Sequence, residues 1–318
     1  MTKPVMNTPN DTHNISPDNR MDQPRFRLQD YALILKPRVM SLVVFTAAVG
    51  LFLAPGEIPV LTSVIAILCI AVGAGASGAI NMWYDQDIDH IMERTQKRPI
   101  PAGRVTPKEA LTIGSILSII SVLVLYFYVN TPSAILLAIT IFYYVFIYTM
   151  WLKRRTPQNI VIGGAAGAFP PMIGWMATSG DITTGPIVLF AIIFLWTPPH
   201  SWALALFRRG DYEAAGVPMM PIVAGDASTK KQMLIYTCLL IPTTLLPVFI
   251  NMSGAIYGIT ALVLGVEFFR RCFKLWQDDG IDKARPLFFF SILYLTFIFM
   301  ALIIDKFLFI PVPLINIF

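Results

Sequence analysis

The sequence predicts an all-α polytopic membrane protein, with nine transmembrane helices in a bundle and an active-site cavity that faces the cytoplasm. Of its 318 residues, 56% are hydrophobic and only 14% are charged, and the mean hydropathy is +0.66. A soluble domain carries about 25% charged residues, so this chain is too apolar to be one. The apolar residues also fall into segments of about 20 residues, the length that crosses the hydrocarbon core of a bilayer.

Nine such segments follow one another along the chain, and polar or charged turns separate them. They cover residues 31–54, 58–83, 107–129, 132–152, 157–178, 185–207, 232–250, 253–273 and 286–308. The first segment contains Lys36 and Arg38 near its start. Because such side chains extend toward the membrane surface, we expect the embedded part to begin near Val39.

A polar tail precedes the bundle. Residues 1–28 are rich in Asn and Pro and contain Asp11, Asp18 and Asp22, so they predict a disordered cytoplasmic tail before a single transmembrane domain at 29–318. The acidic residues argue against a mitochondrial transit peptide, and no apolar signal region with a cleavage site precedes the first span. A bacterial inner (cytoplasmic) membrane is therefore the expected location.

Basic residues predict the orientation of the bundle. With these segments, every Lys and Arg except Lys306 falls on one side of the membrane, which the positive-inside rule makes cytoplasmic. The amino terminus is then cytoplasmic and the carboxyl terminus periplasmic. Topology and acidic lipid headgroups account for the net charge of +5, so we expect a lipid bilayer and no nucleic acid as partner. The three cysteines, Cys69, Cys238 and Cys272, lack paired metal-type spacing and predict neither a disulfide nor a zinc site.

A polar motif at the end of the second segment predicts a diphosphate site. If the helix continues to Asp89, then Asn81, Asp85 and Asp89 fall within roughly an 80° arc of one helix face. Oxygen ligands of this kind suit Mg²⁺, which completes its shell with waters and phosphate oxygens. Four basic residues follow closely and can neutralise phosphate: Arg94, Lys97, Arg98 and Arg104. Asp87 points away from this face and is expected to be solvated or to support a neighbouring residue.

Two long loops on the cytoplasmic side predict two lips of one site. They cover 84–106 and 208–231, lie four helices apart, and suggest a weak duplication of two four-helix halves. In the second loop, Asp211 and Glu213 are too close in sequence to share a helical face. Gly210 and Gly216 predict a turn or a short capped helix there.

The motifs together resemble one family of intramembrane prenyltransferases. The pattern Asn81-x3-Asp85-x3-Asp89 with the basic residues after it is similar to the first signature of the intramembrane aromatic prenyltransferase superfamily. Three further stretches resemble the protoheme IX farnesyltransferase (heme O synthase) family within it: residues 152–171, the run Trp196-Thr197-Pro198-Pro199-His200-x-Trp202, and Asp211-Tyr212-x2-Ala215-Gly216-Val217-Pro218-Met219. The likeness extends from about Tyr31 to the last helix and excludes the tail.

This resemblance implies an activity and the roles of its residues. The activity is Mg²⁺-dependent transfer of farnesyl from farnesyl diphosphate to a vinyl group of heme B, with addition of water. The metal ligands are Asn81, Asp85 and Asp89, with Asp211 for a second ion, and the phosphate clamp is Arg94, Lys97 and Arg98, with help from Arg104. Lys153, Arg154, Arg155 and Tyr212 are expected to bind substrate, as phosphate or heme propionate. The number of magnesium ions stays open because Asp211 has no second acid four residues on, unlike related quinone enzymes. The sequence also leaves open a complex with heme A synthase.

His200 lies beside Pro198 and Pro199 within an apolar segment. A buried histidine there suggests either ligation of heme iron or an interhelical hydrogen bond, and we favour the hydrogen bond because tightly held iron hinders product release. His90, beside the acidic cluster, is a second candidate for heme or phosphate. Gly163 and Gly164 predict close helix packing, and Pro170 with Pro171 predicts a broken helix.

Two other functions fit parts of the sequence. A quinone-precursor prenyltransferase would share the first motif, but the stretches near Trp196 and Asp211 favour heme B as acceptor. A secondary transporter would use intramembrane carboxylates, but its site would lie near the membrane midplane on broken helices. Here the acids stand at the end of a helix.

Overall fold

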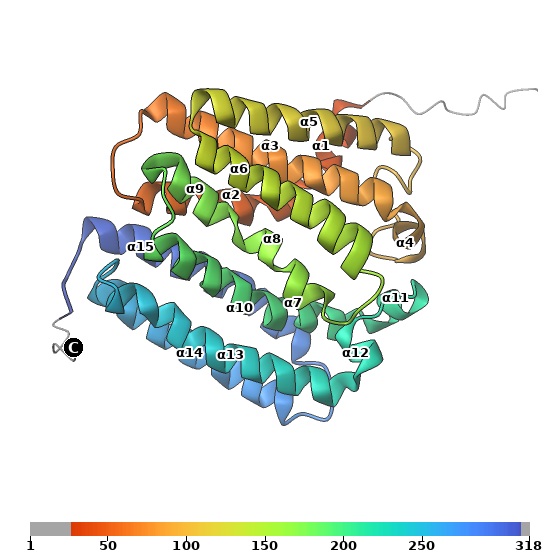
Figure 1. Cartoon of the computed structure of the whole chain (residues 1–318). Helices are drawn as coiled ribbons and strands as arrows, with labels where there is room; N and C mark the ends of the chain where they lie inside the picture. The colour runs from red at the N-terminus through yellow and green to blue at the C-terminus, as the bar shows by residue number, and fades with distance from the viewer. Residues whose placement is uncertain (1–26, 313–318) are drawn as a thin grey trace, which may run out of the picture.

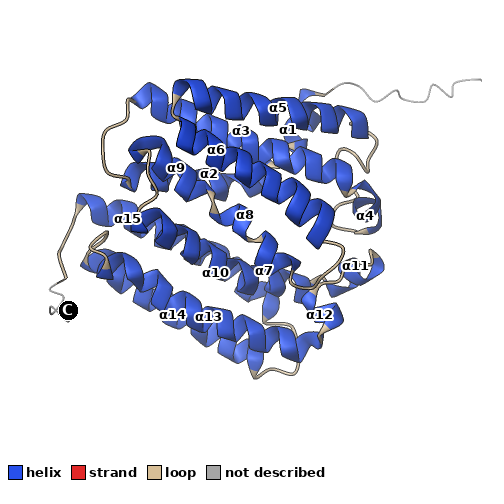
Figure 2. Ribbon diagram, in the orientation of Figure 1, coloured by secondary structure: helices blue, strands red, loops and turns tan. Residues whose placement is uncertain are grey.

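A computed structural model describes residues 27–312, and within that range the chain contains helices and no strands (Figure 2). The predicted polar tail lies outside the described residues except for Arg27 and Leu28, so its disorder stays a prediction. Every one of the nine predicted segments is helical. The all-α class is therefore confirmed.

The helices form a bundle, with the short helices α4 (Gln86–Ile91), α11 (Arg209–Ala214) and α12 (Met220–Val223) at one end (Figure 1). The first part contains α1 (Leu28–Ile34), α2 (Pro37–Leu53), α3 (Val60–Tyr84), α5 (Pro107–Tyr128), α6 (Thr131–Phe142), the π-helix η1 (Tyr143–Leu152), α7 (Asn159–Gly163), α8 (Ala165–Ala168) and α9 (Pro170–Ser179). The second part contains α10 (Thr184–Phe207), α13 (Gly225–Phe249), α14 (Ala255–Trp276) and α15 (Ala284–Phe307). The short helices α4, α11 and α12 belong to the two long loops and gather at the same end.

Length and composition identify fewer candidate spans among the described residues than the nine predicted segments. Among residues 27–312, seven helices are long and apolar enough to cross a membrane, or eight if α1 and α2 form one bent span. The helix α14 has 22 residues but carries Glu267, Arg270 and Arg271, so it is too charged to count. The protein is thus an integral membrane protein, and nine spans stay a prediction.

The chain bends by 56° between α1 and α2. Lys36 stands at the bend with φ of 53°, an uncommon left-handed conformation for a residue with a side chain, and Pro37 starts α2. Two glycines of α3 make room for the bend: a Cβ at Gly75 would lie 3.0 Å from Leu35 Cβ, and one at Gly78 would lie 3.3 Å from Lys36 Cδ. This packing directs Lys36 toward α3.

The helices α2 and α9 cross with their backbones in contact. A Cβ at Gly50 would lie 2.0 Å from the carbonyl oxygen of Pro171, and one at Gly174 would lie 2.0 Å from that of Ala47. Small residues at such crossings allow close packing in a bilayer, where no hydrophobic effect drives helices together. The crossing fixes α9 against the helix that leads to Lys36.

The fifth predicted span is broken into α7, α8 and α9. Pro170 and Pro171 begin α9, as predicted, because proline cannot supply the amide hydrogen that a continuing helix needs. Gly163 in α7 packs under a ring of η1, since a Cβ there would lie 2.1 Å from Tyr148 Cδ2. The predicted close packing at the glycines is confirmed.

The π-helix η1 continues α6 toward the end of the bundle that carries the short helices. Its wider turn is visible in the bond from the backbone N–H of Lys153 to the carbonyl of Tyr148, five residues earlier. Such turns are rare and are found frequently at functional sites. Here η1 ends directly before Lys153.

Candidate functional site

The centre of the site is Asp85, where α3 gives way to α4. The helix does not run on unbroken, since Asp85 separates the two elements with φ of −90° and ψ of 12°. The backbone bonds nevertheless keep the four-residue spacing, from Asp85 N to Asn81 O at 2.9 Å and from Asp89 N to Asp85 O at 2.8 Å. The predicted four-residue spacing of Asn81, Asp85 and Asp89 is therefore kept across the junction between α3 and α4.

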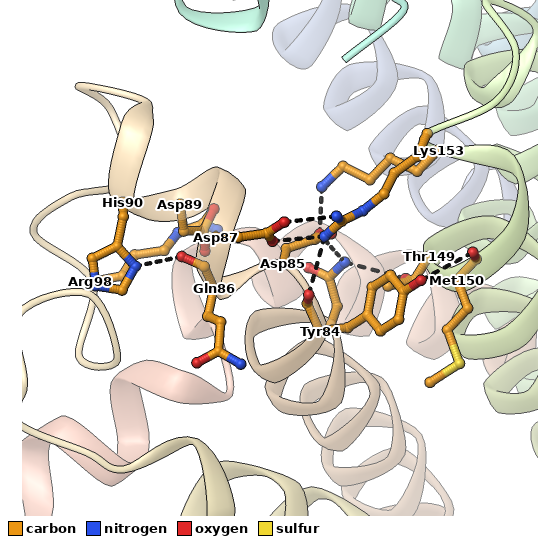
Figure 3. Close-up of polar contacts among 12 residues, drawn as sticks. Tyr84, Asp85, Gln86, Asp87, Asp89, His90, Arg98, Thr149, Met150 and Lys153 are labelled. Atoms are coloured by element: carbon orange, nitrogen blue, oxygen red, sulfur yellow. Dashed lines mark hydrogen bonds and ion pairs between the residues drawn. The ribbon is translucent and has the colours of Figure 1, made fainter. Parts of the chain in front are cut away.

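Asp85 is fully buried and is paired with cations from the end of η1 (Figure 3). Lys153 Nζ donates to Asp85 Oδ2, and Arg154 Nη2 lies 3.6 Å from Asp85 Oδ1. A buried carboxylate is costly unless it is paired. The structure thus brings Lys153 and Arg154 to Asp85, although they are 68 and 69 residues from it in the chain; their binding of substrate stays a prediction.

The charged side chains around Asp85 pair with one another. Burial alone would lower the pKa of Lys153, but the Asp85 carboxylate outweighs it and raises that pKa above its usual value. Arg154 makes a bidentate ion pair with Asp87, with two hydrogen bonds of 2.7 Å, and this pair lowers the pKa of Asp87. Asp87 is exposed, and its contact with Arg154 matches the supporting role considered for it.

Asn81 links α3 to two segments that are distant in sequence. Its amide nitrogen donates to Asp85 Oδ2 at 2.7 Å and to Thr149 Oγ1 at 3.1 Å, and its oxygen accepts from Lys36 Nζ at 2.7 Å. Lys36 and Thr149 are functional candidates that sequence reasoning missed. The only sequence signal for Lys36 was a charge inside an apolar segment.

Asp89 lies on the other side of this group, beside Arg98 (Figure 3). It is 2% exposed and pairs with Arg98 Nη1 at 2.6 Å. Thr95 Oγ1 donates to the carbonyl of Asp89 at 3.0 Å and so holds the first turn of the loop in place. The structure therefore places Arg98 beside Asp89, and its role as a phosphate clamp stays a prediction.

The other predicted basic residues are placed differently. Arg94, Lys97 and Arg155 are exposed, and no ion pair joins them to a described acid. Arg104 bonds to Asp30 Oδ1 of α1 at 2.7 Å and to the Lys97 carbonyl at 3.0 Å, so it anchors the loop to α1. His90 is exposed, and its Nδ1 contacts the Gln86 carbonyl within α4.

The second loop packs against the first. Ile88 and Met92 of the first loop share an apolar cluster with Tyr212, Val217 and Met219 of the second. Arg208 Nη1 bridges them, at 3.9 Å from Glu93 and 3.8 Å from Asp211. Residues 209–214 form the short helix α11, followed by Gly216 at φ of 64°, as the glycines predicted. The two loops therefore meet, as expected for two lips of one site.

Magnesium is the metal that this donor set suits. Asp85 Oδ1 and Asp211 Oδ2 are buried carboxylate oxygens without a hydrogen-bond partner. Within residues 27–312 no three His, Cys, Asp or Glu side chains cluster as a metal site. Magnesium needs only one or two carboxylates, because waters and phosphate oxygens complete its shell. The Asn81 oxygen is occupied by Lys36, so Asn81 as a ligand stays a prediction.

A cavity of about 500 Å³ lies beside these charges, within the size range of small-molecule and cofactor sites. Aromatic side chains line much of it: Tyr144, Tyr148, Trp196 and Phe288. Arg38 and His200 also line it. Tyr148 lines the cavity, and its carbonyl accepts from the backbone N–H of Lys153, the residue that pairs with Asp85, so the cavity adjoins the carboxylate site.

A smaller apolar cavity of about 190 Å³ continues into the bundle. It shares Val39, Val43, Tyr144 and Gly167 with the first and ends among Ile70 and Leu137. The arrangement joins a charged end, which suits a diphosphate, to an apolar interior, which suits a hydrocarbon chain.

Comparison with known proteins gives one family match. Residues 43–293 match the model of the UbiA prenyltransferase family. Relatives named protoheme IX farnesyltransferase include one from Parvibaculum lavamentivorans, 57% identical over 284 residues that cover 88% of this chain and 89% of the relative. Another, from Brucella ovis, is 58% identical over 281 residues, covering 87% and 90%. A third, from Bartonella tribocorum, is 54% identical over 287 residues, covering 89% and 92%.

Solved structures share the same fold. A structure described as digeranylgeranylglyceryl phosphate synthase has a TM-score of 0.74 at 20% identity and covers 87% of this chain and 98% of its own. A UbiA homolog from Archaeoglobus fulgidus, bound to GPP and Mg²⁺, has a TM-score of 0.65 at 15% identity and covers 86% and 99%. At these identities the likeness establishes the fold alone.

Proposed function

Because the chain belongs to the UbiA prenyltransferase family, we propose that it transfers a farnesyl group from farnesyl diphosphate to a vinyl group of heme B. Water adds in the same reaction, and the products are heme O and diphosphate. Three relatives with that name, at 54–58% identity over nearly nine tenths of the chain, support this substrate pair against a quinone precursor. The observation that carries the proposal within the structure is the buried Asp85 group beside a cavity lined by aromatic residues.

The reaction breaks the allylic C–O bond, the vinyl π bond and one O–H bond of water; it makes one C–C bond and one C–O bond and releases a proton to solvent or diphosphate. The allylic C–O bond of farnesyl diphosphate breaks, and its electron pair leaves with the diphosphate. The terminal vinyl carbon of heme bonds to the farnesyl C1, which leaves a cation on the vinyl carbon next to the porphyrin. Water adds to that carbon and loses a proton. The site must therefore stabilise phosphate charge and keep water from the farnesyl cation until the carbon bond forms.

The residues around Asp85 suit the first task. Asp85 would hold magnesium together with Asp89, and Asp211 of the second loop would hold a second ion. When bound, magnesium supplies Lewis-acid stabilisation of the leaving diphosphate. Lys153, Lys36 and Arg98 are now paired with Asn81 or with these acids, and they can turn their donors to phosphate oxygens. Arg94 and Lys97 are exposed at the same loop and can contact the outer phosphate.

The cavities suit the second task. The lining near Ile70 and Leu137 is mostly apolar, and the hydroxyls of Ser77 and Thr140 there donate to carbonyls of their own helices, so this cavity would take the farnesyl chain. The larger cavity has aromatic walls, which suit a flat porphyrin, and Arg38 at its edge would pair with a propionate. We place the protein in a bacterial inner membrane with this end toward the cytoplasm, as the basic residues indicate.

An assay with matched variants tests the function. Membranes containing the protein are supplied with heme B, farnesyl diphosphate and Mg²⁺, and the hemes are separated by chromatography and identified by mass. We expect Asp85→Asn to lose activity by about a hundredfold or more, because a group that organises transition-state charge is removed. Asp181→Asn, an exposed acid in the loop between α9 and α10, should keep full activity.

Metal removal completes the assay. Chelation of magnesium should abolish product formation, and added Mg²⁺ should restore it. Folded wild-type protein that leaves heme B unchanged would refute the acceptor and direct the search to aromatic acids. An active Asp85→Asn variant would refute the site instead.

A further inference from the structure

The ring of His200 is held in one orientation by two helices. His200 Nδ1 lies 2.7 Å from Ser291 Oγ of α15. The ring stacks on Trp196 at 4.2 Å between centroids and on Phe288 at 4.6 Å, with interplanar angles of 17° and 23°. Trp196 Nε1 also donates to the Ser291 carbonyl at 2.7 Å, so α10 and α15 cannot slide past each other without breaking the group.

The hydrogen bonds around Ser291 fix the position of the imidazole proton. The Ser291 hydroxyl donates its single proton to the Phe288 carbonyl at 2.6 Å. Its oxygen must then accept from His200, so the proton of a neutral ring resides on Nδ1. The other nitrogen, Nε2, is left with a free lone pair.

That lone pair is available to a ligand. No described residue bonds to Nε2, and His200 lines the cavity of about 500 Å³. No described acid contacts the ring, and an apolar site favours the neutral form that can bind a metal. Histidine ligands of metals characteristically donate their second ring nitrogen to a fixed acceptor, which sets the tautomer and the ring plane. Ser291 supplies that acceptor here.

We propose that His200 Nε2 is an axial ligand of the iron in the porphyrin substrate, and that Ser291 is its positioning residue. The inference rests on the proposed function, because heme is the acceptor there. It also reconciles the two roles considered for His200, since the interhelical hydrogen bond uses Nδ1 and ligation uses Nε2. With the iron fixed, the porphyrin can present a vinyl group toward Tyr148 and the diphosphate end of the cavity.

Spectroscopy of bound heme tests the ligand. The purified protein in nanodiscs is titrated with ferric and ferrous heme B, and the absorption and electron paramagnetic resonance spectra report the axial ligand. The wild type should give the spectrum of histidine-ligated heme. His200→Ala should lose that spectrum and bind heme about tenfold or more weakly, and imidazole should restore the spectrum.

Iron-free protoporphyrin IX separates ligation from a structural role, because it has the same ring and propionates but no iron. Its affinity, measured by fluorescence, should be the same in the wild type and in His200→Ala. Ser291→Ala should weaken heme binding while Ser291→Thr, which keeps the hydroxyl, should not.

The outcomes distinguish this inference from the proposed function. If His200→Ala keeps the wild-type heme spectrum, or loses heme and iron-free porphyrin equally, ligation is refuted while farnesylation of heme can still be observed. If the wild type binds neither porphyrin and farnesylates no heme, the acceptor is wrong and the ligand assignment is refuted with it.

Discussion

Asp85 is a fully buried carboxylate at the centre of a hydrogen-bonded group that joins three parts of the chain. Lys153 follows η1, Asn81 lies one turn earlier in α3, and Lys36 reaches Asn81 from the bend between α1 and α2. Such a group is stable only while each charge has its partner. The same arrangement keeps cations next to the place where diphosphate would bind, so little reorganisation is needed at the moment of reaction.

At this scale we predict that Lys36 contributes to catalysis. Lys36→Met keeps most of the apolar stem but removes the ammonium group, so kcat/KM for farnesyl diphosphate should fall by about a hundredfold. Initial rates at varied farnesyl diphosphate measure the change. Lys108→Met, an exposed lysine at the start of α5, is the matched control and should behave as the wild type. Equal kinetics for both variants would show that Lys36 serves only the fold.

At the residue scale, the sequence grouped candidate residues that are close along the chain, and the structure brings these into contact. The spacing of Asn81, Asp85 and Asp89 identified the centre, and Arg98, nine residues from Asp89, was found with it. Lys36 was missed because its contact with Asn81 spans 45 residues and depends on a bend that apolar composition does not reveal. Arg104 was expected at phosphate but pairs with Asp30, an acid that lies at the edge of the tail and attracted no attention.

At the scale of elements, the crossing of α2 with α9 offers a test of packing. Gly50→Ala and Gly174→Ala each place a methyl group against a backbone carbonyl, which cannot move as a side chain can. We expect each to destabilise the protein by about 1–3 kcal/mol. Thermal unfolding in detergent measures this. Gly167→Ala is the control, because a Cβ there has nothing within 4 Å. If all three variants unfolded at one temperature, the close crossing would not be a source of stability.

Sequence patterns predicted the long helices better than their irregularities. Pro170 and Pro171 predicted the break before α9, and Gly163 predicted the close packing of α7. The π-helix had no signal, because its residues are as apolar as those of α6 and periodicity cannot register one extra residue per turn. The break at Asp85 was also missed, since it leaves the four-residue spacing intact.

For the whole molecule, we predict that the short helices face the cytoplasm. In a variant with Cys69, Cys238 and Cys272 replaced by Ser, the added substitution Glu57→Cys should give a thiol that reacts with a membrane-impermeant reagent in spheroplasts. A cysteine at Gln96 should react only after the membrane is permeabilised. Both positions are exposed in the structure, so accessibility is decided by topology. The reverse labelling pattern would invert the orientation and place diphosphate binding outside the cell.

The overall architecture was largely predictable, because composition and segment length dictate a helical bundle in a membrane. The number of membrane spans does not follow from helix length alone, since α14 has the length of a span but carries Glu267, Arg270 and Arg271. The contact between the two long loops was suggested only by their shared side of the membrane. Their packing through Ile88 and Tyr212 required the structure.

The junction of a charged end with an apolar cavity makes the molecule a catalyst at a phase boundary. Its two products belong to different solvents: the diphosphate is soluble in water, and the farnesylated porphyrin is not. At about 0.8 kcal/mol for each buried methylene, a farnesyl chain favours the bilayer by roughly 10 kcal/mol. Because the two products separate into membrane and water, they do not readily recombine. The farnesylated porphyrin can reach the next protein that binds it only by diffusing within the membrane or by direct transfer.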